Sequence, residues 1–140
     1  MSSKPALAEA SPTALPFSCN MEISSQDAFE ILFYENLTRR DRTNPAALEL
    51  LGGLYSKYGM PKQTLRIDRR LSKLLPSDAR IRYNFACSLS ILSHKRQAVS
   101  ELSKAIELGY NDWGWMKKDP DLAPLKSYPP FEKLVAAITH

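Results

Sequence analysis

The chain has 140 residues, of which 44% are hydrophobic and 24% charged, and its 19 basic against 15 acidic residues give a net charge of +4. This length is typical of one domain, and the hydrophobic share is sufficient for a buried core. Basic and acidic residues are interleaved along the chain, whereas nucleic-acid modules usually carry a clustered basic stripe. The charge therefore does not favour nucleic acid as a partner.

The sequence shows neither a secretory signal nor a membrane span. Residues 1–20 contain no unbroken apolar run and are interrupted by Pro5, Pro12 and Pro16, and no later window is long and apolar enough to cross a bilayer. The two cysteines, Cys19 and Cys87, lie far apart and form no CxxC pair, so they indicate neither a disulfide framework nor a metal or redox motif. We therefore expect a cytoplasmic protein in a reducing compartment.

Residues 1–23 are rich in Ser, Ala and Pro with little periodicity, which predicts a disordered N-terminal tail. Ser24, followed three residues later by Asp27, indicates the start of a helix in residues 24–43. Its apolar side chains form a wide face, which we expect another element to cover. They are Ala28, Phe29, Ile31, Leu32, Phe33, Tyr34 and Leu37.

Residues 44–76 and 77–109 repeat one layout at a constant offset along the chain. Leu51-Gly52 corresponds to Phe85-Ala86, Tyr55 to Leu89, Thr64 to Ala98 and Leu71 to Ala105. Each copy carries two helical patterns joined by a short connection, so the two helices are expected to be antiparallel neighbours. A fixed period of this size predicts a stacked helical solenoid.

The helix boundaries follow the same layout. Asn44 is a helix N-cap with Pro45 at the first helical position, Gly59 supplies a left-handed stop, and Pro61 begins the second helix. The corresponding signals in the second copy are Ser77-Asp78, Ser93-His94 and Gly109.

Residues 110–140 are predicted to be a degenerate third repeat with a capping helix. Pro120 and Pro124 break any long helix, so we expect two short turns there. Pro129 lies two full periods after Pro61, so FEKLVAAI begins in phase with the earlier second helices. It is expected to pack on the second helix of the preceding copy through Phe131, Leu134, Val135 and Ile138.

The first copy resembles the tetratricopeptide repeat (TPR) in its Leu48-x2-Leu51-Gly52-x2-Tyr55 pattern, followed by Thr64, Leu71 and Pro76. The second copy reads Tyr83-Asn84-Phe85-Ala86-x2-Leu89, then Ala98, Leu102 and Ala105. The ending DWGWMKKDPDLAPLKSYPPFEKL is similar to that of many small bacterial-type TPR proteins. The resemblance, which starts near Asp27 and ends near Thr139, implies an all-α, right-handed superhelical α-solenoid of antiparallel helix pairs, with about seven helices in residues 24–140.

In TPR proteins the first helix of each pair lines a concave groove that holds a peptide segment or helix of another protein. Carried onto this chain, the resemblance places in the groove Glu49, Leu50, Gly53, Ser56 and Lys57 of the first copy, and Arg80, Tyr83, Asn84, Cys87, Ser90 and Ile91 of the second. Residues near Trp115 to Lys118 would add a third helix. Lys57 and Arg80 can supply charged hydrogen bonds, and Asn84 can align a peptide backbone.

Some TPR proteins clamp the C-terminal carboxylate of a chaperone with Lys and Asn of the first groove helix and Asn of the second. Here the first-helix positions hold Glu49 and Gly53, and only Asn84 matches. Because Glu49 would repel a carboxylate, this ligand is not expected.

Two positions depart from the repeat pattern. Asp68 stands where TPR proteins usually have a large apolar residue, and Arg82 stands where the next copy often has Trp or another large residue. A buried acid needs a partner. One hypothesis is that Asp68 pairs with Arg82 or accepts a hydrogen bond from Tyr83; in the alternative, Asp68 and Arg82 both face solvent.

No pattern in the sequence supports catalysis, a metal or a cofactor. His94 and His140 lack cysteines or carboxylates at ligand or triad spacing, and Asp119 and Asp121 flank Pro120 as expected for a turn and helix start. Gly52 and the glycine after it lie inside a helix, where a small residue lets a neighbouring helix approach, and not in a phosphate loop.

These features predict a non-enzymatic interaction protein, an adaptor or chaperone-like module that binds a protein or peptide in the groove. Self-association through the solenoid ends is a further possibility, and the stack could instead only bridge other modules. The alternative is a nucleic-acid accessory protein with a convex basic ridge, weakened by the interleaved Asp41 and Asp68. Its residues would be Arg39, Arg40, Arg42, Arg66, Arg69, Arg70 and Lys73.

Overall fold

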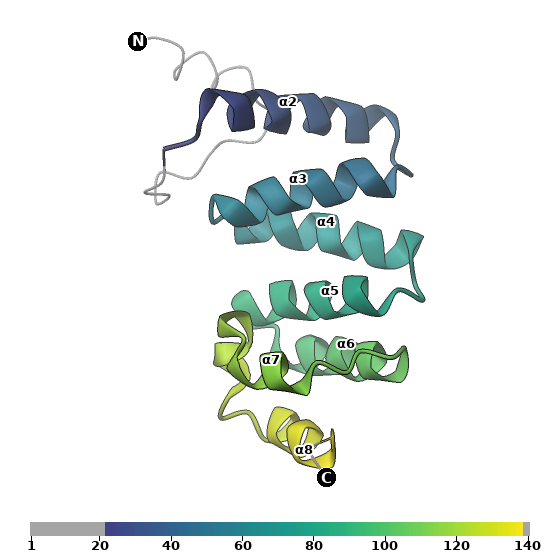
Figure 1. Ribbon diagram of the computed structural model, residues 1–140, viewed down its shortest axis with the longest axis vertical. Coiled ribbons are helices and arrows are strands. Elements are labelled where there is room, and N and C mark those ends of the chain that lie inside the picture. The colour runs from purple at the N-terminus through teal and green to yellow at the C-terminus, as the bar shows by residue number, and fades with distance from the viewer. Residues whose placement is uncertain (1–21, 139–140) are drawn as a thin grey trace. The chain divides into compact units, whose positions relative to one another are not determined.

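The computed structural model describes residues 22–138, and over this range the chain forms seven α-helices, one 3-10 helix and no strand (Figure 1). The helices are α2 (Ser25–Arg40), α3 (Pro45–Lys57), α4 (Pro61–Leu74), α5 (Ala79–Ile91), α6 (Lys95–Glu107), α7 (Trp113–Lys118), η1 (Pro120–Leu125) and α8 (Pro129–Ile138). No helix in this range is long and apolar enough to cross a membrane. Nearly all of the expected tail, with Cys19, and His140 at the other end lie outside the described residues.

The chain divides into two compact units, and their boundary lies inside α4, between Ile67 and Asp68. Unit 1 is described over residues 22–67 and unit 2 over residues 68–138. Each unit is built on a pair of helices that are consecutive in the sequence, α2 with α3 and α5 with α6.

Unit 1 begins at the predicted cap. The Ser24 side chain accepts a hydrogen bond from the Asp27 N–H at 3.0 Å, and α3 begins in the same way, with Asn44 accepting from the Ala47 N–H at 3.1 Å. Each cap satisfies an N–H that has no partner inside its own helix. After α3 the chain turns at Gly59, whose φ of +65° is the left-handed conformation that favours glycine.

The packing of α2 on α3 buries two polar groups together with the apolar core. Tyr55 of α3 is buried and donates its hydroxyl hydrogen to the buried carboxylate of Glu35 on α2. On the other side of α3, a Cβ placed on Gly52 would come within 3.0 Å of the Ile67 side chain, so glycine permits this close approach of α4. The prediction for Gly52 is therefore confirmed.

One expectation about α2 is wrong. Its wide apolar face is only partly covered within the described residues: Phe29 is 64% exposed and Phe33 is 49% exposed, and their rings stack with centroids 6.1 Å apart. The buried residues of α2 are Ile31, which belongs to this apolar face, and the polar residues Glu35 and Thr38. The buried side of the helix is thus partly polar, and the pattern of apolar residues in the sequence does not predict this.

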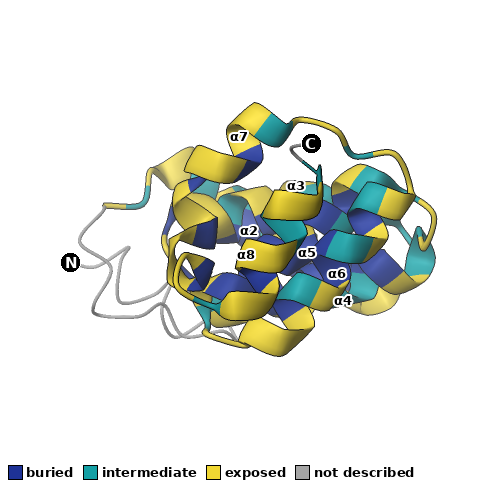
Figure 2. Cartoon of the chain, turned by 90° about the horizontal axis from the view of Figure 1, so that it is seen from below, coloured by how far each residue is buried: buried dark blue, intermediate teal, exposed yellow. Residues whose placement is uncertain are grey.

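Unit 2 has the most continuous core of the described chain. The packed pair α5 and α6 buries Ile81, Phe85 and Leu89 of α5 against Ala98 and Leu102 of α6. Figure 2 colours buried residues dark blue, and both α5 and α6 carry such stretches. The Asp78 side chain caps α5 by accepting from the Arg80 N–H at 3.0 Å. The predicted start at Ser77-Asp78 is confirmed.

The C-terminal segment has the predicted pattern of short helices followed by one longer helix. Because prolines interrupt it, the segment forms α7, the single 3-10 helix η1 and then α8. The helix η1 packs against α5, and α8 packs on α6 as predicted, with Phe131 buried. This arrangement decides which side chains of α5 remain accessible.

Candidate partner-binding surfaces

The helices α3 and α5 expose side chains at matching repeat positions. At the repeat offset, Leu50 corresponds to Asn84 and Lys57 to Ile91, and all four are exposed. Leu50 is 53% exposed and Ile91 is 43% exposed. We call these the α3 face (Glu49, Leu50, Gly53, Ser56 and Lys57) and the α5 face (Arg80, Asn84 and Ile91). Each face lies within one unit and carries an exposed apolar side chain beside polar groups.

The α3 face is open at Leu50, Gly53 and Ser56, whereas Glu49 is half-buried. A Cβ on Gly53 would meet no atom within 4 Å, so this glycine is an open stretch of helix surface. Lys57 is partly engaged: its ammonium lies 2.8 Å from the Asp27 carboxylate, and the hydrogen bond to Asp27 raises the pKa of Lys57. Lys57 therefore links α3 to α2 while most of its side chain stays in solvent.

Three residues expected in the groove on α5, Tyr83, Cys87 and Ser90, are buried. The expectation that they lie open is wrong, and for Tyr83 and Cys87 the reason is that η1 packs against α5 and its cap Asp119 contacts both side chains. The Tyr83 hydroxyl donates to Asp119 at 2.6 Å, and its ring stacks on Tyr110 with centroids 4.2 Å apart. These contacts hold the C-terminal segment in place, so the α5 face keeps only Arg80, Asn84 and Ile91.

The side chains of Cys87, Asp119 and Asp121 offer three atoms within 4.8 Å of one another, the spacing of a metal site. Their contacts have another explanation. Asp119 caps η1 by accepting from the Asp121 N–H at 2.9 Å, and it also accepts from Tyr83 and from the Cys87 thiol at 3.6 Å. Burial, followed by the nearby Asp119, raises the pKa of Cys87, which keeps the thiol protonated. Cys87 and Asp119 are buried and Asp121 is exposed, and the hydrogen bonds of the cluster are those of a helix cap.

Asp68 is buried on α4, but its predicted partners are wrong. Its carboxylate accepts a hydrogen bond from the Ser88 hydroxyl of α5, whereas Arg82 pairs with Glu101 at 2.9 Å and Tyr83 pairs with Asp119. The alternative, in which Asp68 faces solvent, is also wrong. Burial raises the pKa of Asp68 to about 6, and the Ser88 hydrogen bond lowers it by less.

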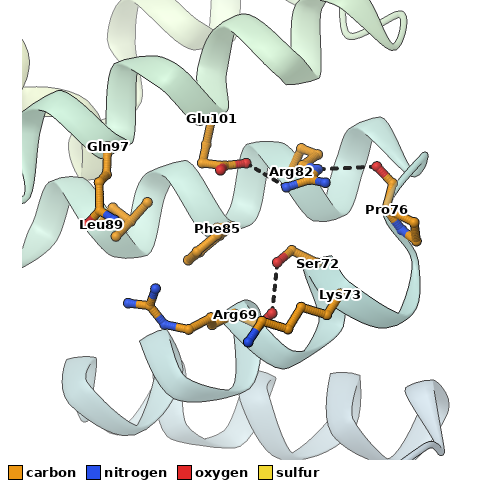
Figure 3. A pocket seen from close by; sticks show the side chains of 9 residues that line it. All are labelled: Arg69, Ser72, Lys73, Pro76, Arg82, Phe85, Leu89, Gln97 and Glu101. Atoms are coloured by element: carbon orange, nitrogen blue, oxygen red, sulfur yellow. Dashed lines mark hydrogen bonds and ion pairs between the residues drawn. The ribbon is translucent and has the colours of Figure 1, made fainter.

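Unit 2 also contains a pocket of about 410 Å³ between the C-terminal half of α4 and the pair α5 and α6 (Figure 3). It is lined by Arg69, Ser72, Lys73, Pro76, Arg82, Phe85, Leu89, Gln97 and Glu101. Two of the residues predicted for a convex basic ridge, Arg69 and Lys73, meet here. The sequence indicates this pair of cations in one way: Arg69 and Lys73 lie one helical turn apart, directly after the buried acid Asp68.

The remaining ridge residues are spread over both units. Arg39, Arg40, Arg42 and Arg66 belong to unit 1 and are exposed, while Arg70 belongs to unit 2 and is half-buried. Of the two acids that interleave with the ridge, Asp68 is buried and Asp41 is exposed.

Comparison with known proteins supports a TPR-like fold. The crystal structure of MamA, a TPR-like protein, aligns with 84% of this chain and 75% of its own chain, with a TM-score of 0.55 and 19% sequence identity. The chain is thus an all-α solenoid of the TPR-like kind. No protein-family model matches it.

One relative is similar in sequence. A chloroplastic protein of Arabidopsis thaliana is 32% identical over an alignment of 110 residues, which covers 76% of this chain and 33% of that protein. The chain therefore spans about a third of the length of the relative. That the chain is of a bacterial type stays a prediction.

Proposed function

We propose that this chain is a non-enzymatic protein-interaction module that binds a peptide segment or helix of a partner protein on the first helices of its repeats. The proposal rests on one observation: the α3 and α5 faces are exposed at corresponding repeat positions, and each has an exposed apolar side chain, Leu50 or Ile91, next to polar groups. The TPR-like fold supports it, because such solenoids present extended binding surfaces.

The chemistry of both faces suits a peptide. On the α3 face, Leu50 offers an apolar contact, Gly53 leaves room for a backbone to approach, and Lys57 offers a cation. On the α5 face, Ile91 offers the apolar contact, and Asn84 can both donate to and accept from a peptide backbone. Apolar anchors surrounded by polar groups are the usual composition of a specific interface.

The test is affinity purification from native lysate with three variants. Leu50→Ser and Ile91→Ser remove the apolar contacts of the two faces, while Leu108→Ser is the matched control, because Leu108 is 39% exposed and lies at the end of α6, outside both faces. We expect specific proteins to be recovered with the wild type and with Leu108→Ser, and to be reduced with Leu50→Ser or Ile91→Ser. Circular dichroism confirms that each variant is folded.

Equal recovery with all the variants would remove the proposal. Recovery that disappears after nuclease treatment would favour the nucleic-acid alternative, and so would binding that falls steeply with salt concentration. Location in the cytoplasm and self-association stay predictions; the name of the plant relative places that protein in the chloroplast.

A further inference from the structure

The pocket of unit 2 holds two cationic side chains that have no ionic partner among the described residues. Arg69 and Lys73 lie one turn apart on α4, on the same side of the helix. No carboxylate of the described chain forms a salt bridge with either of them. In Figure 3 both side chains extend along the pocket from α4. The pocket therefore carries positive charge that is not neutralised from within unit 2.

The acid of the pocket is already engaged. Glu101, which is buried, accepts from the Arg82 guanidinium at 2.9 Å and from the Lys104 ammonium at 3.2 Å. Arg82 also donates to the Pro76 carbonyl at 3.2 Å, so it is fixed on two sides. These bonds leave Arg69 and Lys73 as the pocket cations available to an incoming anion.

One of these two cations is restrained by an aromatic ring of the pocket lining. The Arg69 guanidinium lies 5.4 Å from the centre of the Phe85 ring, a cation–π distance, which restrains the cation before any ligand arrives. Phe85 and Leu89 are buried side chains of the pocket lining, and Gln97 is exposed beside them. The Gln97 amide can donate to and accept from a peptide backbone.

We propose that this pocket binds an acidic side chain of a partner peptide, with the carboxylate between Arg69 and Lys73. The charge of the pocket determines the occupant, because two cations with no ionic partner among the described residues match the carboxylate of an Asp or Glu. The buried carboxylate of Glu101 and the small number of free cations disfavour a nucleic-acid backbone, which needs a continuous row of cations.

This site goes beyond the proposed function, because it lies on a different side of α5. Successive residues of an α-helix turn by about 100°, so Phe85 and Leu89 lie about 100–160° around the helix from Asn84 and Ile91. A ligand in the pocket and a ligand on the α5 face therefore contact separate side chains. A result that rules out binding at one site therefore does not rule out binding at the other.

The test uses two synthetic peptides and the full chain labelled with ¹⁵N. The acidic probe is Glu-Glu-Leu-Phe-Glu-Glu, and its neutral counterpart replaces each Glu by Gln. We expect the acidic probe to shift the backbone amide signals of residues lining the pocket, to bind more weakly as salt is added, and to bind at least about tenfold more tightly than the neutral peptide.

The double variant Arg69→Gln/Lys73→Gln should bind the acidic probe at least about tenfold more weakly than the wild type. Its matched control is Arg96→Gln/Lys117→Gln, which removes the same charge from exposed residues outside the pocket lining and should bind as the wild type does. The Leu50→Ser and Ile91→Ser variants should also retain binding. This result separates the pocket from the α3 and α5 faces.

Three results would overturn the proposal. The first is the absence of signal changes at the pocket, and the second is an equal loss of binding in the double variant and its control. The third is a pocket that responds to inorganic phosphate or to a single-stranded oligonucleotide but not to the acidic peptide, because the occupant is then a different anion.

Discussion

Asp68 shows how one buried carboxyl group makes stability depend on pH. The group lies inside unit 2 with the Ser88 hydroxyl as its hydrogen-bond donor, and burial raises its pKa from 3.8 to about 6. A raised pKa means that the folded state holds the proton more tightly than the unfolded state does. The stability gained from the neutral carboxyl is thus fully present below pH 3.8 and is lost as the pH rises through about 6.

We expect the variant Asp68→Asn to lack this dependence on pH. Relative to the variant, the unfolding free energy of the wild type should fall by roughly 2–3 kcal/mol between about pH 4 and pH 7, since one pKa unit corresponds to about 1.4 kcal/mol. Urea unfolding at several pH values measures this difference. Asp27, whose pKa is lowered by Lys57, acts in the opposite direction in both proteins and cancels in the comparison.

A constant difference between Asp68→Asn and the wild type over this pH range would contradict the raised pKa. A difference that grows in favour of the wild type as the pH rises would show that the ionised carboxyl is the stabilised form. That result would mean that a positive charge lies near Asp68 in solution and stabilises its ionised form.

The sequence leaves open whether Asp68 is buried, and neither of the partners it suggests is the right one. Its place in the repeat is usually apolar, which favours a buried position, but a charged side chain can also turn to solvent there. The choice of Ser88 over Arg82 or Tyr83 depends on which side chains of α5 turn toward α4, and Ser88 is a small hydroxyl residue with no charge to mark it. Arg82 and Tyr83 each find an acid elsewhere in unit 2, at Glu101 and Asp119.

At the scale of the helices, the two adjacent glycines of α3 have different roles. Gly52 is buried against Ile67, and a Cβ there would lie 3.0 Å from the Ile67 side chain, while Gly53 faces open space. Alanine is favoured over glycine in a helix by about 1 kcal/mol, but an added methyl group in a packed contact typically costs about 1–3 kcal/mol.

We therefore expect Gly52→Ala to lower the unfolding free energy by about 1–2 kcal/mol, because Ile67 is buried and β-branched and has little freedom to move aside. Gly53→Ala is the matched control and should raise the unfolding free energy by up to about 1 kcal/mol. Urea unfolding of both variants measures the changes. Stabilisation of similar size in both variants would show that α3 and α4 do not approach closely at Gly52.

The sequence predicts where most helices begin because the signals are local. Ser24, Asn44 and Asp78 each cap a helix with a side-chain oxygen, and Pro129 is the first residue of α8. The sequence predicts the short turns and the last helix of the C-terminal segment, but it does not predict that η1 packs against α5. The packing of η1 on α5 rests on the contacts of Asp119 with Tyr83 and Cys87, which join positions far apart in the sequence.

At the scale of the whole chain, the fixed repeat period and the TPR-like fold agree, while the exposed residues of α5 differ from those expected in the groove. Tyr83 and Cys87 are removed from that surface by η1, and Arg69 and Lys73 form a pocket on another side of unit 2. Repeat position predicts which residues lie on one side of a helix. It does not predict which of those sides a non-repetitive segment later covers.

The most direct test of partner binding on the α3 and α5 faces is photo-crosslinking in cells. Benzoylphenylalanine is introduced in turn at Leu50, at Ile91 and, as the control, at Leu108, all three of which are exposed. If the two faces bind a partner, one protein will crosslink reproducibly from Leu50 or Ile91 and not from Leu108. Crosslinks to the same proteins from all three positions, or from Leu108 alone, would contradict binding on these faces.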